Sequence, residues 1–156
     1  NGAVAGAGLS LASACDVRVA SSAAVFVPGF VGLGLVPDSG ATWFLPRIIG
    51  PARTFEWMCT NRRLEADEAL AWGLVSEVFA ADEFSARAAE LAATWAQLPT
   101  SAVGMMKKLF DQGHDATLDD QLAAEAELQE VAIGSADFAE GIAAFRAKRP
   151  ATFSGR

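Results

Sequence analysis

The chain has 156 residues, of which 52% are hydrophobic and 20% charged, and its 19 acidic and 12 basic side chains give a net charge of −7. This composition excludes a disordered chain and suffices for one domain with a hydrophobic core. An acidic chain without a basic cluster argues against nucleic acid as a partner. The longest uncharged stretch, residues 19–37, is interrupted by Ser, Pro and Gly, which argues against a membrane helix.

The chain opens on a glycine-rich segment, N-G-A-V-A-G-A-G-L-S. We interpret it as a tight turn that leads into a buried helix through L-S-L-A-S-A. Proteins seldom begin at such a turn, so we expect the opening part of the fold to be missing from this sequence.

Short strands and helices are predicted to alternate next. Residues 16–19 alternate polar and apolar side chains, and residues 24–27 are rich in valine and phenylalanine, so both segments are predicted strands. A helix is predicted to open at residues 37–40 and to run through Leu45. Pro51 has the position of a first-turn proline in the next helix, which should end near Cys59.

A further helix and strand complete the mixed region. Residues 64–72 predict a short helix, and Gly73 is suited to its left-handed C-terminal cap. Residues 74–79 predict a strand. From residue 81 onward, apolar periodicity predicts helices alone, with cap signals at Thr117 and Ser135.

Two readings of the glycine-rich segment remain open from spacing alone. A Gly turn at a helix start can present free backbone N–H groups to a phosphate or to a developing oxyanion. Alternatively, its glycines serve only the close packing of the helix. The dinucleotide-binding pattern does not fit, because the spacing differs and no strand is predicted before the turn.

Asp38, in V-P-D-S-G-A-T-W, also has two readings. Aspartate is a favoured helix N-cap, and P-D-S-G is typical of a turn. A functional acid would need an apolar surrounding, because burial raises the pKa of a carboxyl group toward neutral pH. The first 50 residues carry only four charges, which favours such a surrounding: Asp16, Arg18, Asp38 and Arg47.

Other chemistries find little support in the residues. His114 is the only histidine and lies in a polar stretch, so no metal cluster is predicted. Ser10 and Ser13 have no histidine in sequence context, which argues against a hydrolase triad. The two cysteines, Cys15 and Cys59, predict a reduced, cytoplasmic protein rather than a disulfide-bonded one.

Four blocks of the sequence resemble the enoyl-CoA hydratase/isomerase (crotonase) superfamily in order and together cover nearly the whole chain. They are G-A-V-A-G-A-G-L-S-L-A-S-A-C-D, F-V-P-G-F-V-G-L-G-L-V-P-D-S-G-A-T-W-F-L-P-R-I-I-G, N-R-R-L-E-A-D-E-A-L-A-W-G-L-V-S-E-V-F and D-F-A-E-G-I-A-A-F-R-A-K-R-P-A-T-F-S-G-R.

The resemblance implies an α/β fold, the crotonase-like (ClpP/crotonase) spiral of ββα units, incomplete here at its N terminus. Residues 1–80 would form the C-terminal part of the spiral core, and residues 81–156 a helical trimerisation region. It also implies an acyl-CoA thioester as substrate, a homotrimer or a hexamer built as a dimer of trimers, and no cofactor, since coenzyme A is part of the substrate.

The resemblance also assigns roles to single residues. One N–H of the family's oxyanion hole falls at Ala7, supported by Gly6 and Gly8. The two glutamates of the hydratases fall at Ser10 and Phe30, neither of which has a carboxylate, so hydratase activity is not expected.

Asp38 is therefore the expected catalytic residue. Its string P-D-S-G-A-T-W-F-L-P-R is similar to the phenylacetate-pathway isomerases, except that Ala41 replaces a glycine of the family pattern. The expected activity is isomerisation of an enoyl-CoA or epoxyphenylacetyl-CoA. The alternatives are a hydratase-like or hydrolase-like enzyme of acyl-CoA degradation, and a non-catalytic CoA-binding member. Lys148 matches a family lysine that can contact the CoA phosphates.

Overall fold

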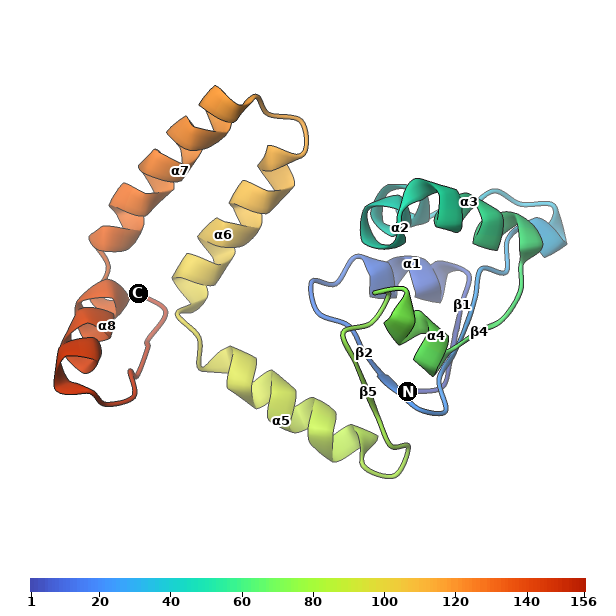
Figure 1. Cartoon of the computed structure of the whole chain (residues 1–156), viewed down its shortest axis with the longest axis horizontal. Helices are drawn as coiled ribbons and strands as arrows, with labels where there is room; N and C mark the ends of the chain where they lie inside the picture. The colour runs from blue at the N-terminus through green and yellow to red at the C-terminus, as the bar shows by residue number, and fades with distance from the viewer. The chain divides into compact units, whose positions relative to one another are not determined.

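The computed structural model describes residues 1–156, and its contacts divide the chain into two compact units, Asn1–Ala89 (unit 1) and Glu90–Arg156 (unit 2) (Figure 1). The boundary lies nine residues beyond the one predicted between residues 80 and 81. None of the helices is both long and apolar enough to cross a bilayer.

Two small sheets organise unit 1. Strand β1 (Ala3–Ala5) pairs in parallel with β3 (Val25–Val27), and β3 pairs antiparallel with β4 (Leu64–Glu65). The second sheet joins β2 (Val19–Ser21) in parallel to β5 (Glu77–Phe79).

Four α-helices complete this part of the chain. They are α1 (Ala7–Ser13), α2 (Ala41–Ile49), α3 (Pro51–Thr60) and α4 (Ala66–Ala71), with a 3-10 turn, η1, at Val31–Leu33. Helices α1 and α4 pack on the strands, and α2 packs on both α1 and α3. The side chains that fill the core include Leu9, Phe26, Leu45, Trp57, Leu64 and Leu74.

The strands are the elements that the sequence predicted least well. No strand was predicted before the Gly turn, and this prediction is wrong, because β1 lies directly before it. The strand predicted at residues 16–19 begins only at Val19, and the one predicted at 74–79 begins only at Glu77. These strands have three residues each, so their limits depend on their partners rather than on a local pattern.

Helix α2 also begins later than predicted. Residues 37–40 form a turn with Ser39 and Gly40 in the left-handed region, and the first helical residue is Ala41. Gly73, by contrast, has the predicted left-handed conformation, with φ of 76° after α4.

The helices of the C-terminal part are α5 (Phe84–Ala96), α6 (Thr100–Gly113), α7 (Leu118–Ile133) and α8 (Ala136–Ala147). The two predicted N-caps are confirmed. Thr117 Oγ accepts from the Asp120 N–H at 3.2 Å, and Ser135 Oγ accepts from the Phe138 N–H at 3.0 Å. Helices α6 and α7 pack against each other as a hairpin (Figure 1).

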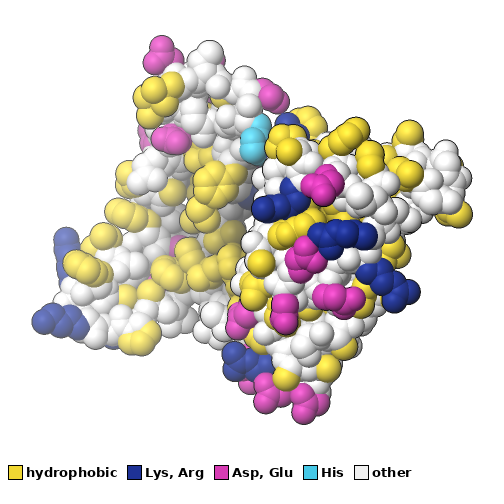
Figure 2. Space-filling model, turned by 45° about the vertical axis from the view of Figure 1, so that its right-hand side comes forward, with side chains coloured by type: hydrophobic (Ala, Val, Ile, Leu, Met, Phe, Trp, Pro, Cys, Tyr) yellow, Lys and Arg dark blue, Asp and Glu magenta, His cyan; other side chains and the backbone are white.

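Unit 2 leaves many large apolar side chains in contact with solvent, and Figure 2 shows hydrophobic side chains over much of its visible surface. The most exposed are Phe110, Leu118, Leu122, Val131 and Phe145. Soluble proteins seldom leave this much apolar surface uncovered.

Candidate active site

The turn between β1 and α1 is built around Gly6. Its φ of 54° and ψ of −126° lie in a region that only glycine adopts without strain. Its N–H donates to Val27 O at 3.2 Å, and its carbonyl accepts from the Leu9 and Ser10 N–H groups at 3.0 and 3.2 Å. The N–H groups of Ala7 and Gly8, in the first turn of α1, have no backbone acceptor. The turn can therefore donate to an acceptor outside the chain.

A second turn, Pro28–Phe30, lies beside the first. Because β1 and β3 are parallel, their carboxyl ends meet at the same edge of the sheet. A Cβ added to Gly29 would lie 3.4 Å from the Gly6 nitrogen and 3.7 Å from Gly6 Cα. These distances are ordinary van der Waals contacts, so the two turns pack directly on each other. Gly29 also has a φ of 78°, a conformation that favours a residue without a side chain.

The two positions that the resemblance matched to hydratase glutamates, Ser10 and Phe30, hold buried side chains without a carboxylate. Ser10 is completely buried, and its hydroxyl turns back toward Gly6 O at 3.4 Å. Phe30 is 5% exposed and belongs to the hydrophobic core. Neither side chain can activate a water as a carboxylate would.

Asp38 lies in the turn that leads into α2, but it does not cap that helix. The N-cap is Gly40, and no side chain caps the helix N-terminus, so the capping interpretation of Asp38 is wrong. The Asp38 carbonyl accepts from the Ala41 N–H at 3.0 Å. The side chain is exposed, so residues 1–156 do not supply the apolar surrounding that the sequence predicted.

Lys148 belongs to unit 2, whereas the other predicted residues belong to unit 1. It is exposed and has a left-handed conformation, with φ of 53°, at the end of α8. The next residue, Arg149, binds Glu140 through two hydrogen bonds of 2.7 and 2.8 Å. This pair, together with the Thr152 N–H, lowers the pKa of Glu140 to about 2. The backbone around Lys148 is thus fixed, while its ammonium group is accessible.

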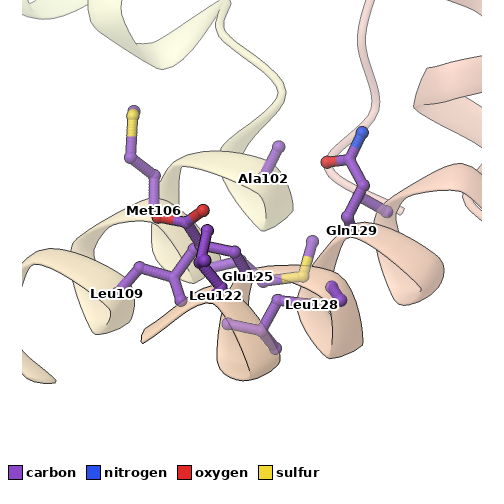
Figure 3. A pocket seen from close by; sticks show the side chains of 10 residues that line it. Ala102, Met106, Leu109, Leu122, Glu125, Leu128 and Gln129 are labelled. Carbon is purple, nitrogen blue, oxygen red and sulfur yellow. The ribbon is translucent and has the colours of Figure 1, made fainter. Parts of the chain in front are cut away.

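An open groove runs between α6 and α7, but it holds none of the predicted site residues. Figure 3 shows Met106, Leu109, Leu122 and Leu128 along it, with Glu125 and Gln129 as its polar side chains. His114, at the end of α6, is exposed.

Sequence reasoning missed one residue beside the Gly turn. Asn61 follows α3, and its Oδ1 accepts from the Gly29 N–H at 2.7 Å. Its position directly after a helix was the available signal, because Asn is the residue other than Gly that most readily ends a helix in the left-handed conformation. The long-range hydrogen bond itself has no local sequence pattern.

Comparison with known proteins identifies the class to which this fold and turn belong. A family model described as Enoyl-CoA hydratase/isomerase matches residues 1–156, and the chain belongs to that family. The crystal structure of an enoyl-CoA hydratase from Polaromonas sp. JS666 superposes with a TM-score of 0.92 at 36% identity, covering 99% of this chain and 60% of that one. The predicted crotonase-type α/β fold is thereby confirmed.

Curated relatives carry more than one activity in their names. The chain is 40% identical over 156 residues to a 1,2-epoxyphenylacetyl-CoA isomerase of Escherichia coli, covering all of this chain and 60% of the relative. It is 39% identical over 150 residues to a 4-chlorobenzoyl coenzyme A dehalogenase of Arthrobacter, covering 95% of this chain and 54% of the relative. The chain thus spans little more than half the length of the proteins it matches.

Proposed function

We propose that the full-length protein is a CoA-thioester isomerase that moves a proton along an enoyl-CoA or epoxyphenylacetyl-CoA through Asp38. The observation that carries the proposal is the distribution of carboxylates. Ser10 and Phe30, the residues that the resemblance matches to the hydratase glutamates, are buried and have no carboxylate. Asp38 has an exposed carboxylate at the start of the segment that leads into α2, and α2 packs on α1 after the Gly turn.

The mechanism begins with the thioester oxygen. The Ala7 N–H would donate to that oxygen and stabilise the negative charge that develops on it, which acidifies the neighbouring carbon. The Asp38 carboxylate then accepts a proton from the acyl chain, leaving an enolate, and returns the same proton at another carbon. In an enoyl-CoA the double bond shifts, and the atoms and the charge stay balanced. In epoxyphenylacetyl-CoA the bond between the two oxygen-bearing ring carbons would break as well, which opens the ring to an oxepin. These steps need no metal and no redox cofactor, and coenzyme A enters as part of the substrate.

A second candidate function is hydrolytic dehalogenation of an aryl-CoA thioester, favoured by the similarity to the Arthrobacter dehalogenase. In that reaction the Asp38 carboxylate would attack the halogen-bearing ring carbon as a nucleophile, and chloride would leave. Water would then hydrolyse the resulting ester. An accessible carboxylate without a capping partner suits a nucleophile as well as a base.

A substrate panel with the full-length protein separates these functions. We expect migration of the double bond in an enoyl-CoA or conversion of epoxyphenylacetyl-CoA, no hydration of crotonyl-CoA, and no chloride release from 4-chlorobenzoyl-CoA. Chloride release without isomerisation would replace the first proposal by the second. Efficient hydration would contradict both proposals, since it would require a pair of acids that Ser10 and Phe30 do not supply. Binding of CoA thioesters without turnover of any would indicate a non-catalytic member.

We also propose that the protein acts in the cytoplasm as a homotrimer or dimer of trimers, with unit 2 at the subunit contacts and Lys148 near the CoA phosphates. The exposed apolar side chains of α6, α7 and α8 support subunit contacts through unit 2, because a soluble monomer seldom leaves so many uncovered. The place of Lys148 near the CoA phosphates can be tested by substitution. Lys148→Ala should raise KM several-fold with little change in kcat, since the lysine would touch a non-reacting part of the substrate.

A further inference from the structure

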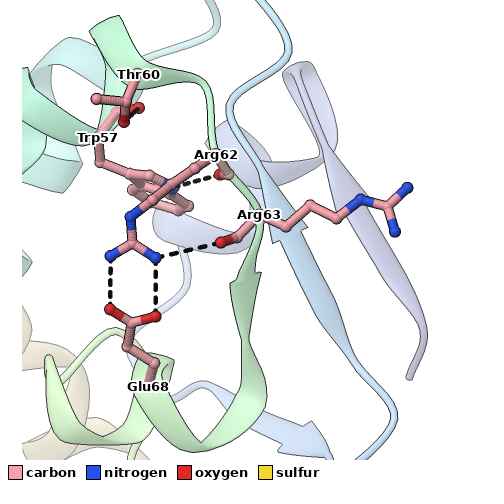
Figure 4. A network of polar contacts seen from close by, with 5 residues as sticks. All are labelled: Trp57, Thr60, Arg62, Arg63 and Glu68. Carbon is pink, nitrogen blue, oxygen red and sulfur yellow. Dashed lines mark hydrogen bonds and ion pairs between the residues drawn. The ribbon is translucent and has the colours of Figure 1, made fainter.

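Asn61 joins the end of α3 to the turn beside Gly6. It has a left-handed conformation, with φ of 53°, and its N–H donates to Trp57 O at 3.0 Å. The same tryptophan, which is fully buried, donates its Nε1–H to Arg62 O at 3.0 Å (Figure 4). Trp57 thus fixes the backbone at Asn61 and immediately after it, so the side chain of Asn61 is presented from a rigid position.

The amide of Asn61 makes two close approaches to the segment of residues 29–32. Its Oδ1 accepts from the Gly29 N–H at 2.7 Å, a short hydrogen bond that spans 32 residues of sequence. A Cβ added to Gly32 would lie only 2.9 Å from Asn61 Nδ2, so the amide packs directly on the backbone of Gly32. Asn61 therefore holds both ends of this segment, with Phe30 between them.

Gly29 is itself packed on the Gly turn. Its amide nitrogen is bonded to Asn61, and the space of its absent side chain is bounded by Gly6 N and Cα. Gly6 in turn donates to Val27 O on the same strand–turn segment. A continuous chain of contacts therefore runs from Asn61 through Gly29 to Gly6, the residue that precedes Ala7.

We propose that Asn61 is a positioning residue that sets the place of the Ala7 N–H through Gly29 and Gly6. The inference deepens the proposed function and rests on it, because a fixed N–H matters to catalysis only when it stabilises the thioester oxygen. Such stabilisation depends on donors held in place before the reaction, and small displacements lower the rate steeply.

A helix cap alone would not need this side chain. Ending α3 requires only a left-handed backbone, which glycine adopts more readily than asparagine. Asn61→Gly therefore keeps the cap and removes the amide, whereas Asn61→Asp keeps an oxygen that accepts from the Gly29 N–H. The two variants separate the role of the side chain from the role of the backbone.

The test measures hydrogen exchange at the Gly29 amide and steady-state turnover in the full-length protein. For Asn61→Gly we expect a slightly lowered melting temperature, because the Gly29 N–H loses its acceptor. We also expect faster exchange at Gly29 and a fall in kcat of roughly ten-fold at a nearly constant KM. Asn61→Asp should restore both the slow exchange and the rate. Unchanged exchange at Gly29, or unchanged kcat in Asn61→Gly, overturns the proposal.

Gly32→Ala perturbs the contact of the Asn61 amide with residues 29–32 from the side of Gly32. The added methyl group would displace the Asn61 amide, so kcat should fall in this variant as well. In an Asn61→Gly background the methyl group meets no amide, and Gly32→Ala should have no further effect. If the falls in kcat of the two single variants added up in the double variant, the two residues would not act through the same contact. A wild-type protein that turns over no CoA thioester would refute the proposed function and the positioning role, while the exchange measurement still decides whether the Asn61–Gly29 bond exists.

Discussion

Single glycines decide the geometry of the Gly turn. The sequence predicted that Gly6 and Gly8 support the turn, but it could not separate their roles. Of these two, Gly6 has a positive φ, whereas Gly8 is an ordinary residue of α1 with nothing within 4 Å of an added Cβ. The same spacing of glycines therefore contains one position that requires glycine and one that does not.

Replacing these two glycines by alanine should have opposite effects. Gly6→Ala should lower the free energy of unfolding by about 1–3 kcal/mol, because alanine is strained at φ 54° and ψ −126°. Gly8→Ala is the matched control and should raise it by up to about 1 kcal/mol, because alanine favours a helix. Urea unfolding of the full-length variants measures both. Equal effects of the two substitutions would contradict the geometry of the turn.

Among the secondary-structure elements, helices were easier to predict than strands. The caps of α7 and α8 are visible in the sequence because Thr117 and Ser135 bond to N–H groups only three residues ahead. Strands β1 and β2 are defined by partners 22 and 58 residues away, and no local pattern contains that information. The hydrogen bond from Gly29 to Asn61 was unpredictable for the same reason.

Removing one of these caps should lower the free energy of unfolding by a small amount. Ser135→Ala should lower the free energy of unfolding by about 1 kcal/mol, because the Phe138 N–H at the start of α8 loses its acceptor. Ser85→Ala, at an exposed position of α5, should be neutral or slightly stabilising. Denaturant midpoints compare the two, and a loss no larger in Ser135→Ala than in Ser85→Ala would show that the cap contributes nothing.

At the scale of the whole molecule, the fold class followed from four sequence blocks, and the family match over residues 1–156 confirms it. The exposure of Asp38 could not be foreseen, because burial depends on which segments surround a loop and not on the few charges near it in sequence. The attachment of the C-terminal tail was also unforeseen. Asp137 accepts from the Ser154 and Gly155 N–H groups, and Glu140 from Thr152.

The C-terminal tail, residues 150–156, should detach from α8 in acid. The Ser154 N–H, above all, lowers the pKa of Asp137, and Arg149 lowers that of Glu140 from 4.5 to about 2. A carboxylate with a depressed pKa stabilises the folded form above its unfolded pKa, and this stabilisation is lost as the pH falls from 4.5 toward 2. Hydrogen exchange of residues 150–156, corrected for intrinsic rates, should therefore show protection near neutral pH and a loss of it in this acid range.

Glu140→Gln tests the cause of that release. The neutral amide cannot form the charged pair with Arg149, so the tail should exchange faster at neutral pH and respond less to acid. Glu127→Gln, at an exposed position of α7, should behave as the wild type. Equal tail protection in Glu140→Gln and the wild type would rule out this attachment.

The most direct test of the central claim is isomerase turnover of Asp38→Asn in the full-length protein. Asparagine keeps the size of the side chain but cannot accept the proton, so kcat should fall by roughly 10²–10⁴-fold, with an unchanged melting temperature and unchanged affinity for the CoA thioester. Asp82→Asn, an exposed acid between β5 and α5, should retain full turnover. Full isomerase turnover in Asp38→Asn would contradict the account.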